Sequence, residues 1–285
     1  MGAVIVRAVI YLVCLAWPGA TARGAPSLSY LSKVTDLVLN NEPDPLTTLS
    51  PTPSPSLTFT LPPTIVPNPP TKYGVVLFPA FEMLDVFGPL EVLSWAARLH
   101  EKLDLYLLAE TLDPVTTQPQ SAAMNTFNSS FFPTVNPTHT FGDNPELDVL
   151  IVPGGLGTRN PNMDRTLQFI SSTYPKVQYL ITVCTGSALV AQTGILDGRR
   201  ATTNKASWDS VIVNGPNTTW VPEARWVVDG NIWTSSGISA GIDATLAFVA
   251  ELYGKENATV ISEYMEYEWH EDSDWDPYAE IWGVV

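Results

Sequence analysis

The sequence contains little positive charge. Only 14 of its 285 residues are Lys or Arg, against 29 Asp and Glu, which gives a formal net charge of −15. Nucleic-acid binding depends on clustered Lys and Arg side chains that neutralise phosphates. Because the sequence has no such cluster, we expect no nucleic-acid partner. With 45% hydrophobic and only 15% charged residues, the chain has enough apolar material for a large folded core.

Cysteine is also scarce, since only Cys14 and Cys184 are present. Cys14 lies in an apolar stretch, residues 8–17, which is followed by small residues. This order is typical of a secretory signal peptide, here residues 1–22, although an uncleaved anchor or a mispredicted start is the alternative. We therefore expect a secreted protein that is free of the membrane after cleavage. Such a protein keeps one thiol and forms no internal disulfide.

Three Asn-X-Ser/Thr sequons agree with a secretory route. They begin at Asn128, Asn217 and Asn257, and we expect these residues as glycosylation sites.

Proline is concentrated in one part of the chain. Residues 23–70 are rich in Pro, Ser and Thr, and ten of the prolines fall within residues 43–70, where no apolar period is visible. Such a composition cannot bury enough surface to offset the entropy of ordering, so we expect a largely disordered linker.

Strand and helix patterns alternate from residue 71 to residue 255. The expected strands are 73–78, 103–109, 147–152 and 179–183, with a hairpin at 225–234, and the expected helices are 90–99, 164–174, 186–192, 239–252 and 258–269. This alternation predicts an α/β fold with a flavodoxin-like, doubly wound, mostly parallel sheet sandwiched by helices. We expect the acidic, aromatic residues 256–285 to form a helix and a tail that pack on this domain. Ligands of such sheets bind beyond the carboxyl ends of the strands.

Cys184 stands at one of these strand ends. It directly follows an apolar strand and precedes the helix that begins near Gly186. The free amides of a helix start favour a thiolate, so the position predicts a nucleophile with a lowered pKa. A buried, inert core cysteine is the alternative.

Asp85 follows the first strand among apolar neighbours, just before Gly88-Pro89. Burial there would raise its pKa and allow it to act as a proton donor. An ordinary turn or helix cap is the alternative.

A third strand end carries the paired glycines Gly154 and Gly155. Glycines after a strand allow the backbone to approach a ligand closely and to aim an amide at it. Neither a Rossmann nor a P-loop pattern is present.

Five motifs in this order resemble the PfpI/ThiJ family of the class I glutamine amidotransferase-like superfamily. They are Leu84-Asp85-Val86-Phe87-Gly88-Pro89, Val152-Pro153-Gly154-Gly155, Val183-Cys184-Thr185-Gly186, Arg200-Ala201-Thr202-Thr203 and Ser235-Ser236-Gly237. Within this family the chain is most similar to isonitrile hydratase-like proteins and their fungal relatives, which suggests a secreted fungal member.

The resemblance implies roles for particular residues. Cys184 would be the nucleophile, Asp85 its acid/base partner and Thr185 a supporting residue. The amides of Gly155 and Thr185 would stabilise an anion. Gly154, Asn204, Ser236 and Gly237 would line the substrate site, although a hairpin end and a helix cap also explain the Ser-Gly segment. The family also implies a homodimer without metal or cofactor.

One position departs from the family. Many relatives have a His directly after the Ala-Thr-Thr stretch, where this chain has Asn204. Asn cannot act as a base near neutral pH, so a Cys–His peptidase or amidotransferase is not expected. The favoured function is a cofactor-independent lyase that hydrates a small isonitrile. A redox-sensing or non-enzymatic binding protein of the same fold is the alternative.

Overall fold

The computed structural model describes residues 66–285. The predicted signal peptide and residues 23–65 of the predicted linker lie outside this range. Val66 already contacts the core, and its amide donates a hydrogen bond to the carbonyl of Leu252 at 3.3 Å. The packed part of the chain therefore begins before the predicted boundary at residue 71.

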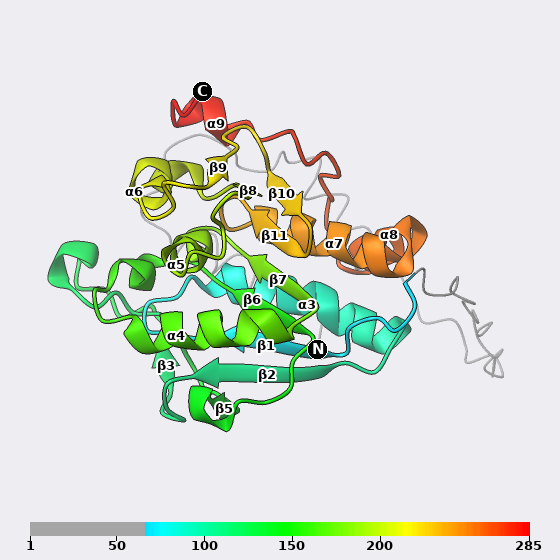
Figure 1. Ribbon diagram of the computed structural model, residues 1–285, viewed down its shortest axis with the longest axis horizontal. Helices are drawn as coiled ribbons and strands as arrows, with labels where there is room; N and C mark the ends of the chain where they lie inside the picture. The colour runs from blue at the N-terminus through cyan, green and yellow to red at the C-terminus, as the bar shows by residue number, and fades with distance from the viewer. Residues whose placement is uncertain (1–65) are drawn as a thin grey trace, which may run out of the picture. The chain divides into compact units, whose positions relative to one another are not determined.

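A seven-stranded sheet forms the centre of the described chain (Figure 1). The strand order is β10-β11-β7-β6-β1-β2-β5, and every neighbouring pair is parallel except the hairpin of β10 and β11. The strands are β1 (Lys72–Val76), β2 (Asp104–Ala109), β5 (His139–Thr140), β6 (Val149–Val152), β7 (Tyr179–Thr182), β10 (Trp226–Asp229) and β11 (Ile232–Ser235). This arrangement confirms the predicted fold class.

Helices cover both faces of the sheet (Figure 1). One group packs together on one face: α3 (Met83–Leu99), α7 (Ala240–Tyr253) and α8 (Lys255–Tyr264). The other face carries α4 (Asp164–Thr173) and α5 (Gly186–Gln192). Because both faces are covered, the central strands β1, β6 and β7 are mostly apolar and are buried along nearly their whole length.

Short elements that have no readable period were not predicted. They include two small sheets, β3 (Val115–Thr116) with β4 (Thr134–Val135) and β8 (Arg200–Ala201) with β9 (Thr219–Trp220). The helices α6 (Trp208–Ile212) and α9 (Tyr278–Ile281) and the 3₁₀ turn η5 (Lys205–Ser207) belong to the same class. A two-residue strand or a single helical turn shows no alternation in sequence.

The first helix begins earlier than the sequence predicts. A start after Gly88-Pro89 is expected, whereas α3 begins at Met83 and contains Pro89. Proline removes one helical hydrogen bond but does not stop a helix that tertiary packing supports. Asp85 therefore lies in the first turn of α3 rather than in a turn ahead of it.

The expected helix at 258–269 is also shifted, because α8 covers Lys255–Tyr264. Asn257 lies within this helix and is fully buried, and its side-chain amide donates to the carbonyl of Tyr253. The predicted glycosylation of Asn257 is therefore wrong for the folded protein, whereas Asn128 and Asn217 are exposed and stay predictions.

No helix of residues 66–285 is long and apolar enough to cross a membrane.

Asp243 fastens the segment after α8 to the core. Its buried carboxylate accepts hydrogen bonds from the guanidinium of Arg225, at 2.6 and 2.7 Å. Its other oxygen accepts from the Tyr267 hydroxyl at 3.1 Å and from the His270 amide at 3.0 Å. One carboxylate thus joins α7 to Arg225, just before β10, and to the segment after α8.

Replacing Asp243 with Ala should lower the free energy of unfolding by about 3–5 kcal/mol, because Arg225 would remain buried without a counter-charge. Asp274→Ala, an exposed change in the same terminal segment, should alter it by less than about 0.5 kcal/mol. Urea unfolding of both variants measures this difference. Equal losses would contradict a special role for Asp243.

Candidate active site

Strand register brings distant residues to one level. Thr182 of β7 pairs with Val152 of β6 on one side and with Thr234 of β11 on the other. All three strands are parallel, so they leave the sheet at the same edge. The residues two positions beyond these three therefore lie side by side.

Those residues are Gly154, Cys184 and Ser236. The Cys184 amide donates to the carbonyl of Ser236 at 3.0 Å, which continues the pairing of β7 with β11 past the strand ends. Cys184 consequently sits between two neighbouring loops at the carboxyl edge of the sheet, where the fold class predicts a site.

Cys184 occupies a strained turn between β7 and α5. Its φ of +57° is in the left-handed region, which costs a non-glycine residue about 1–2 kcal/mol. The turn is tight because α5 begins directly against β6: a Cβ on Gly186 would lie 2.2 Å from the carbonyl oxygen of Val152. The hydroxyls of Ser187 and Thr203 donate to the Cys184 carbonyl at 3.2 and 3.0 Å and hold the turn in place.

Asp85 reaches the same place from the first turn of α3. Its side chain is fully buried, and its Oδ2 accepts a hydrogen bond from the Gly154 amide at 2.8 Å. The close approach requires glycine, because a Cβ on Gly154 would lie 2.9 Å from that oxygen and 2.5 Å from the Thr185 nitrogen. The Glu82 amide also donates to the Gly154 carbonyl at 2.9 Å, so the two loops are joined in both directions.

Burial raises the pKa of Asp85 to about 7. The negative charge of Glu82 acts in the same direction, whereas hydrogen bonds from the Gly154 amide and the Cys184 thiol lower the pKa. The carboxyl is therefore present in both protonation states near neutral pH. A carboxyl with a pKa near 7 is suited both to give and to take a proton at neutral pH.

The pKa of the Cys184 thiol is raised, and the expected lowering is wrong. Burial is the main cause, and the negative charge of Asp85 adds to it. Amides of Ile238 and Thr185 donate to the sulfur and oppose the rise, but they do not overcome it. The amides at the helix start do favour the thiolate, but burial and the second negative charge beside the Asp85 carboxyl outweigh them.

The Thr185 hydroxyl takes part in hydrogen bonds with the loop that follows β6. Its Oγ1 accepts from the Gly155 amide at 2.9 Å and from the Thr158 hydroxyl at 3.2 Å. The Gly155 amide is thus occupied, so the expected anion-stabilising pair of Gly155 and Thr185 is not free in this structure. The amides that point at the sulfur are those of Thr185 and Ile238.

The other predicted residues also gather near Cys184. Asn204, Ser236 and Gly237 line one cavity, and the Asn204 side chain fits closely against the bare Cα of Gly237. Asn204 Oδ1 also accepts from the Ser207 amide at 3.0 Å and caps η5. Their part in substrate binding stays a prediction.

Two contributors were missed by the sequence analysis. Glu82 lies one turn before Asp85, half-buried, and its charge acts on both Asp85 and Cys184. A helix that begins at Met83 would have placed it there, but the helix start was misassigned. The Ile238 amide carries no sequence signal, because any residue has one.

The histidines pack away from the thiol. The rings of His100, His139 and His270 lie against Tyr253, Tyr106 and Trp275, respectively. This placement agrees with the absence of His after the Ala-Thr-Thr stretch. Within residues 66–285, no group of three or more His, Cys, Asp or Glu side chains is arranged to hold a metal ion.

Comparison with known proteins gives one consistent result. The DJ-1/PfpI family pattern matches residues 72–251. An isonitrile hydratase of Pseudomonas putida is 39% identical over 199 residues, which cover 69% of this chain and 78% of that protein. A deglycase of Pyrococcus abyssi is 27% identical over 161 residues, covering 56% of this chain and 89% of the relative. A solved ThiJ/PfpI family protein from Pseudomonas syringae superimposes with a TM-score of 0.59 at 27% identity, over 79% of this chain and 84% of that structure.

Replacing Asp85 with Asn should stabilise the protein at pH 8. Because the folded pKa is about 7 and the ordinary value is 3.8, wild type loses stability as the pH rises from about 4 to about 7, by up to about 4 kcal/mol in total. The variant escapes this loss, so its advantage should be largest at pH 8 and vanish near pH 4. Denaturant unfolding at both pH values measures it.

Asp148→Asn provides the control of opposite sign. Despite partial burial, backbone hydrogen bonds from Thr71 and Lys72 hold the pKa of Asp148 below its usual value. This change should destabilise the protein at pH 8. An Asp85→Asn variant that is no more stable than wild type at pH 8 would show that the pKa of Asp85 is not raised.

Proposed function

This chain belongs to the DJ-1/PfpI family, and on that basis we propose that it is a cofactor-independent hydratase that adds water to a small isonitrile. The observation that carries the proposal is the buried pairing of one thiol with one carboxyl whose pKa is about 7, at the carboxyl edge of the sheet. The 39% identity to the Pseudomonas putida isonitrile hydratase supports the substrate class.

The first step forms a bond between sulfur and carbon. Asp85 as carboxylate takes the thiol proton of Cys184, and the sulfur attacks the terminal carbon of the isonitrile. Asp85 then returns the proton to that carbon, which gives a thioimidate. The Ile238 and Thr185 amides, which point at the sulfur, stabilise it while it carries negative charge.

The second step releases the product. Asp85, again a carboxylate, takes a proton from water, and the oxygen bonds to the thioimidate carbon. Asp85 gives that proton to the nitrogen. As the sulfur–carbon bond breaks, the hydroxyl proton passes to the sulfur, and an N-substituted formamide leaves. The sum is one isonitrile plus one water, and the thiol and carboxyl return to their starting states.

A redox sensor is the weaker alternative. Thiolates, and not thiols, react with oxidants, so a sensor cysteine normally has a low pKa and is exposed. Cys184 is 5% exposed, and its pKa is raised. These properties favour a thiol that is activated only when Asp85 takes its proton.

Turnover of methyl isonitrile to N-methylformamide should be abolished by Cys184→Ala. Asp85→Asn should lower kcat by roughly 10²–10⁴-fold, because it keeps the shape but removes the proton carrier. The double variant should cost little more than the Cys change alone. In wild type, kcat/KM should rise with pH through about 7, as Asp85 ionises. Full activity of Cys184→Ala would refute the mechanism.

We also propose that the protein is exported and acts as a homodimer. The predicted leader and the exposed sequons at Asn128 and Asn217 support export.

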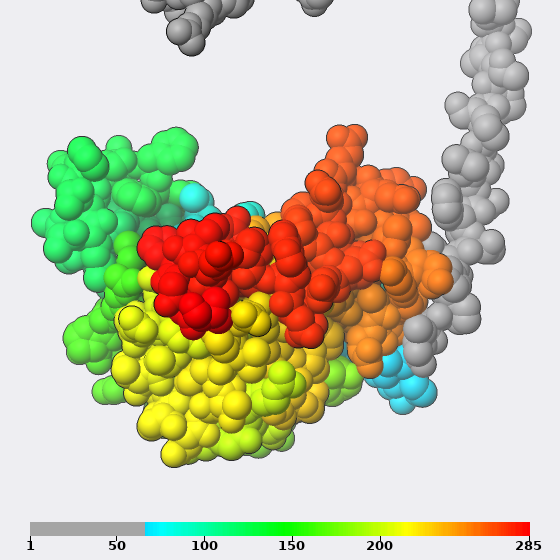
Figure 2. Space-filling model, turned by 90° about the horizontal axis from the view of Figure 1, so that it is seen from above, coloured from blue at the N-terminus to red at the C-terminus, as the bar shows by residue number. Residues whose placement is uncertain are grey.

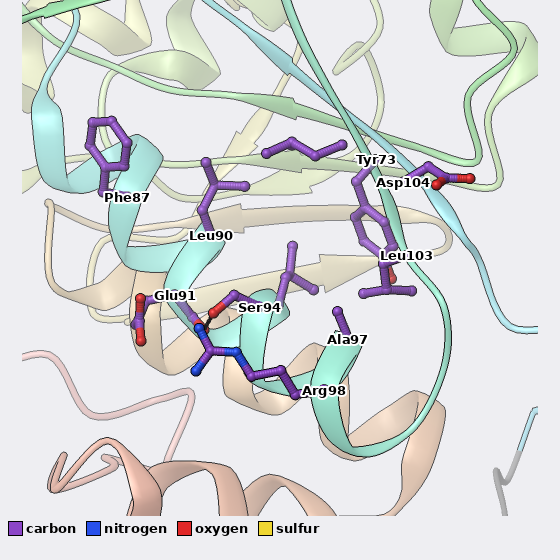
Figure 3. A pocket seen from close by; sticks show the side chains of 11 residues that line it. Tyr73, Phe87, Leu90, Glu91, Ser94, Ala97, Arg98, Leu103 and Asp104 are labelled. Carbon is purple, nitrogen blue, oxygen red and sulfur yellow. Dashed lines mark hydrogen bonds between the residues drawn. The ribbon is translucent and has the colours of Figure 1, made fainter.

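An apolar hollow of about 460 Å³ between α3 and β2 is a candidate surface for a second copy. Figure 3 shows Phe87 and Leu90 of α3 and Tyr73 of β1 around this hollow.

Leu105→Asp should turn the dimer into a monomer, because Leu105 is 45% exposed and lines the hollow. Val213→Asp, on an exposed apolar residue outside it, should leave the dimer intact. Sedimentation velocity measures both masses. A wild-type monomer, or a Leu105→Asp dimer, would contradict this interface.

A further inference from the structure

The end of the chain forms part of a cavity beside the nucleophile. The cavity has a volume of about 190 Å³ and is lined by residues from three places. Tyr278 and Trp282 come from α9 and its end. Residues 204–206 form the N-cap and the start of η5, and residues 236–239 follow β11. Both aromatic residues lie beyond residue 251, where the family match ends.

The same loop after β11 binds the nucleophile. The Ser236 carbonyl accepts from the Cys184 amide at 3.0 Å, and the Ile238 amide donates to the Cys184 sulfur. Residues that line the cavity are thus in direct contact with the reacting residue. The cavity therefore begins at the loop whose Ser236 and Ile238 backbone groups contact Cys184.

A buried ion pair fixes the position of α9. The carboxylate of Asp276 pairs with the Lys205 ammonium at 3.3 Å, and both side chains are almost fully buried. Its second oxygen accepts from the Tyr278 amide at 3.1 Å, at the start of α9. Lys205 also donates to the Thr202 hydroxyl and to the Ala224 carbonyl, each at 2.8 Å. Figure 2 shows this C-terminal segment, in red, lying against the yellow part of the chain.

The two aromatic side chains are held in place but uncovered. Tyr278 is 48% exposed and Trp282 is 56% exposed, and within residues 66–285 neither ring packs on another aromatic ring. Exposed aromatic surface gains free energy when an apolar group covers it. An apolar cavity of about 150 Å³ is enough to hold a benzene ring.

We propose that Tyr278 and Trp282 are specificity-determining residues that receive a flat, apolar substituent of the molecule that reacts with Cys184. The proposal rests on the proposed function for the identity of that molecule, an isonitrile that bears an aromatic or cyclic group. The ion pair of Lys205 and Asp276 is the positioning element, because it joins η5 to the start of α9.

The test compares two reagents that alkylate Cys184 by the same chemistry. N-benzyliodoacetamide carries a flat ring and iodoacetamide carries none, so the ratio of their rates cancels any change in the thiolate fraction. Tyr278→Ala and Trp282→Ala should each lower this ratio roughly tenfold. Ile281→Ala is the matched control, because Ile281 lies on the same helix, is 68% exposed and does not line the cavity. Mass spectrometry of the Cys184 peptide measures the rates.

The kcat/KM ratio for benzyl and methyl isonitrile should fall in the same variants. If neither isonitrile is hydrated but the alkylation ratio falls in the Tyr278 and Trp282 variants, the role of these two residues stands and the hydratase proposal fails. If both isonitriles are hydrated and neither ratio changes, the hydratase proposal stands and the specificity role of Tyr278 and Trp282 is refuted. An equal fall in Ile281→Ala would also overturn the proposal. Thermal melting near the wild-type temperature verifies that these exposed changes keep the fold.

Discussion

The site depends on the hydrogen bond from the Gly154 amide to Asp85. It joins the loop after β6 to the first turn of α3, and it is possible only because Gly154 has no side chain. One amide is not enough to offset the burial of the carboxyl, so the pKa of Asp85 stays near 7. A second strong donor would lower that pKa, and the group would lose its ability to hold a proton at neutral pH. The proposed chemistry thus relies on a buried carboxyl whose Oδ1 has no hydrogen-bond partner within the described residues.

Much of the fold follows from sequence, because buried parallel strands and glycine-bearing strand ends leave local patterns. The runs at β1, β6 and β7 and the position of Cys184 between β7 and α5 are of this kind. The start of α3 was missed, since Gly88 and Pro89 suggest a helix start while tertiary packing sets the actual one. The raised pKa of the thiol could not be found locally, because it depends on burial and on Asp85, 99 positions away. The state of the Gly155 amide likewise depends on the rotamer of Thr185.

The C-terminal segment is held by buried ion pairs that leave no local pattern in the sequence. Its aromatic and acidic composition indicates packing on the domain, but nothing local indicates which acid is buried. Asp243 with Arg225 and Asp276 with Lys205 form two buried ion pairs, and each connects elements far apart in sequence. Such pairs add little net stability over apolar contacts, but removing one partner is costly. They therefore act mainly to specify where the last residues lie.

This dependence on the last residues has a consequence for synthesis. A chain leaves the ribosome from its N-terminus, and domains fold as their segments emerge. Here Lys205 would enter the interior before Asp276 is available, and the cavity beside Cys184 would lack one wall until α9 appears. The turn that carries Cys184 is thus formed by the middle of the chain, whereas the cavity beside it is completed only when α9 is in place.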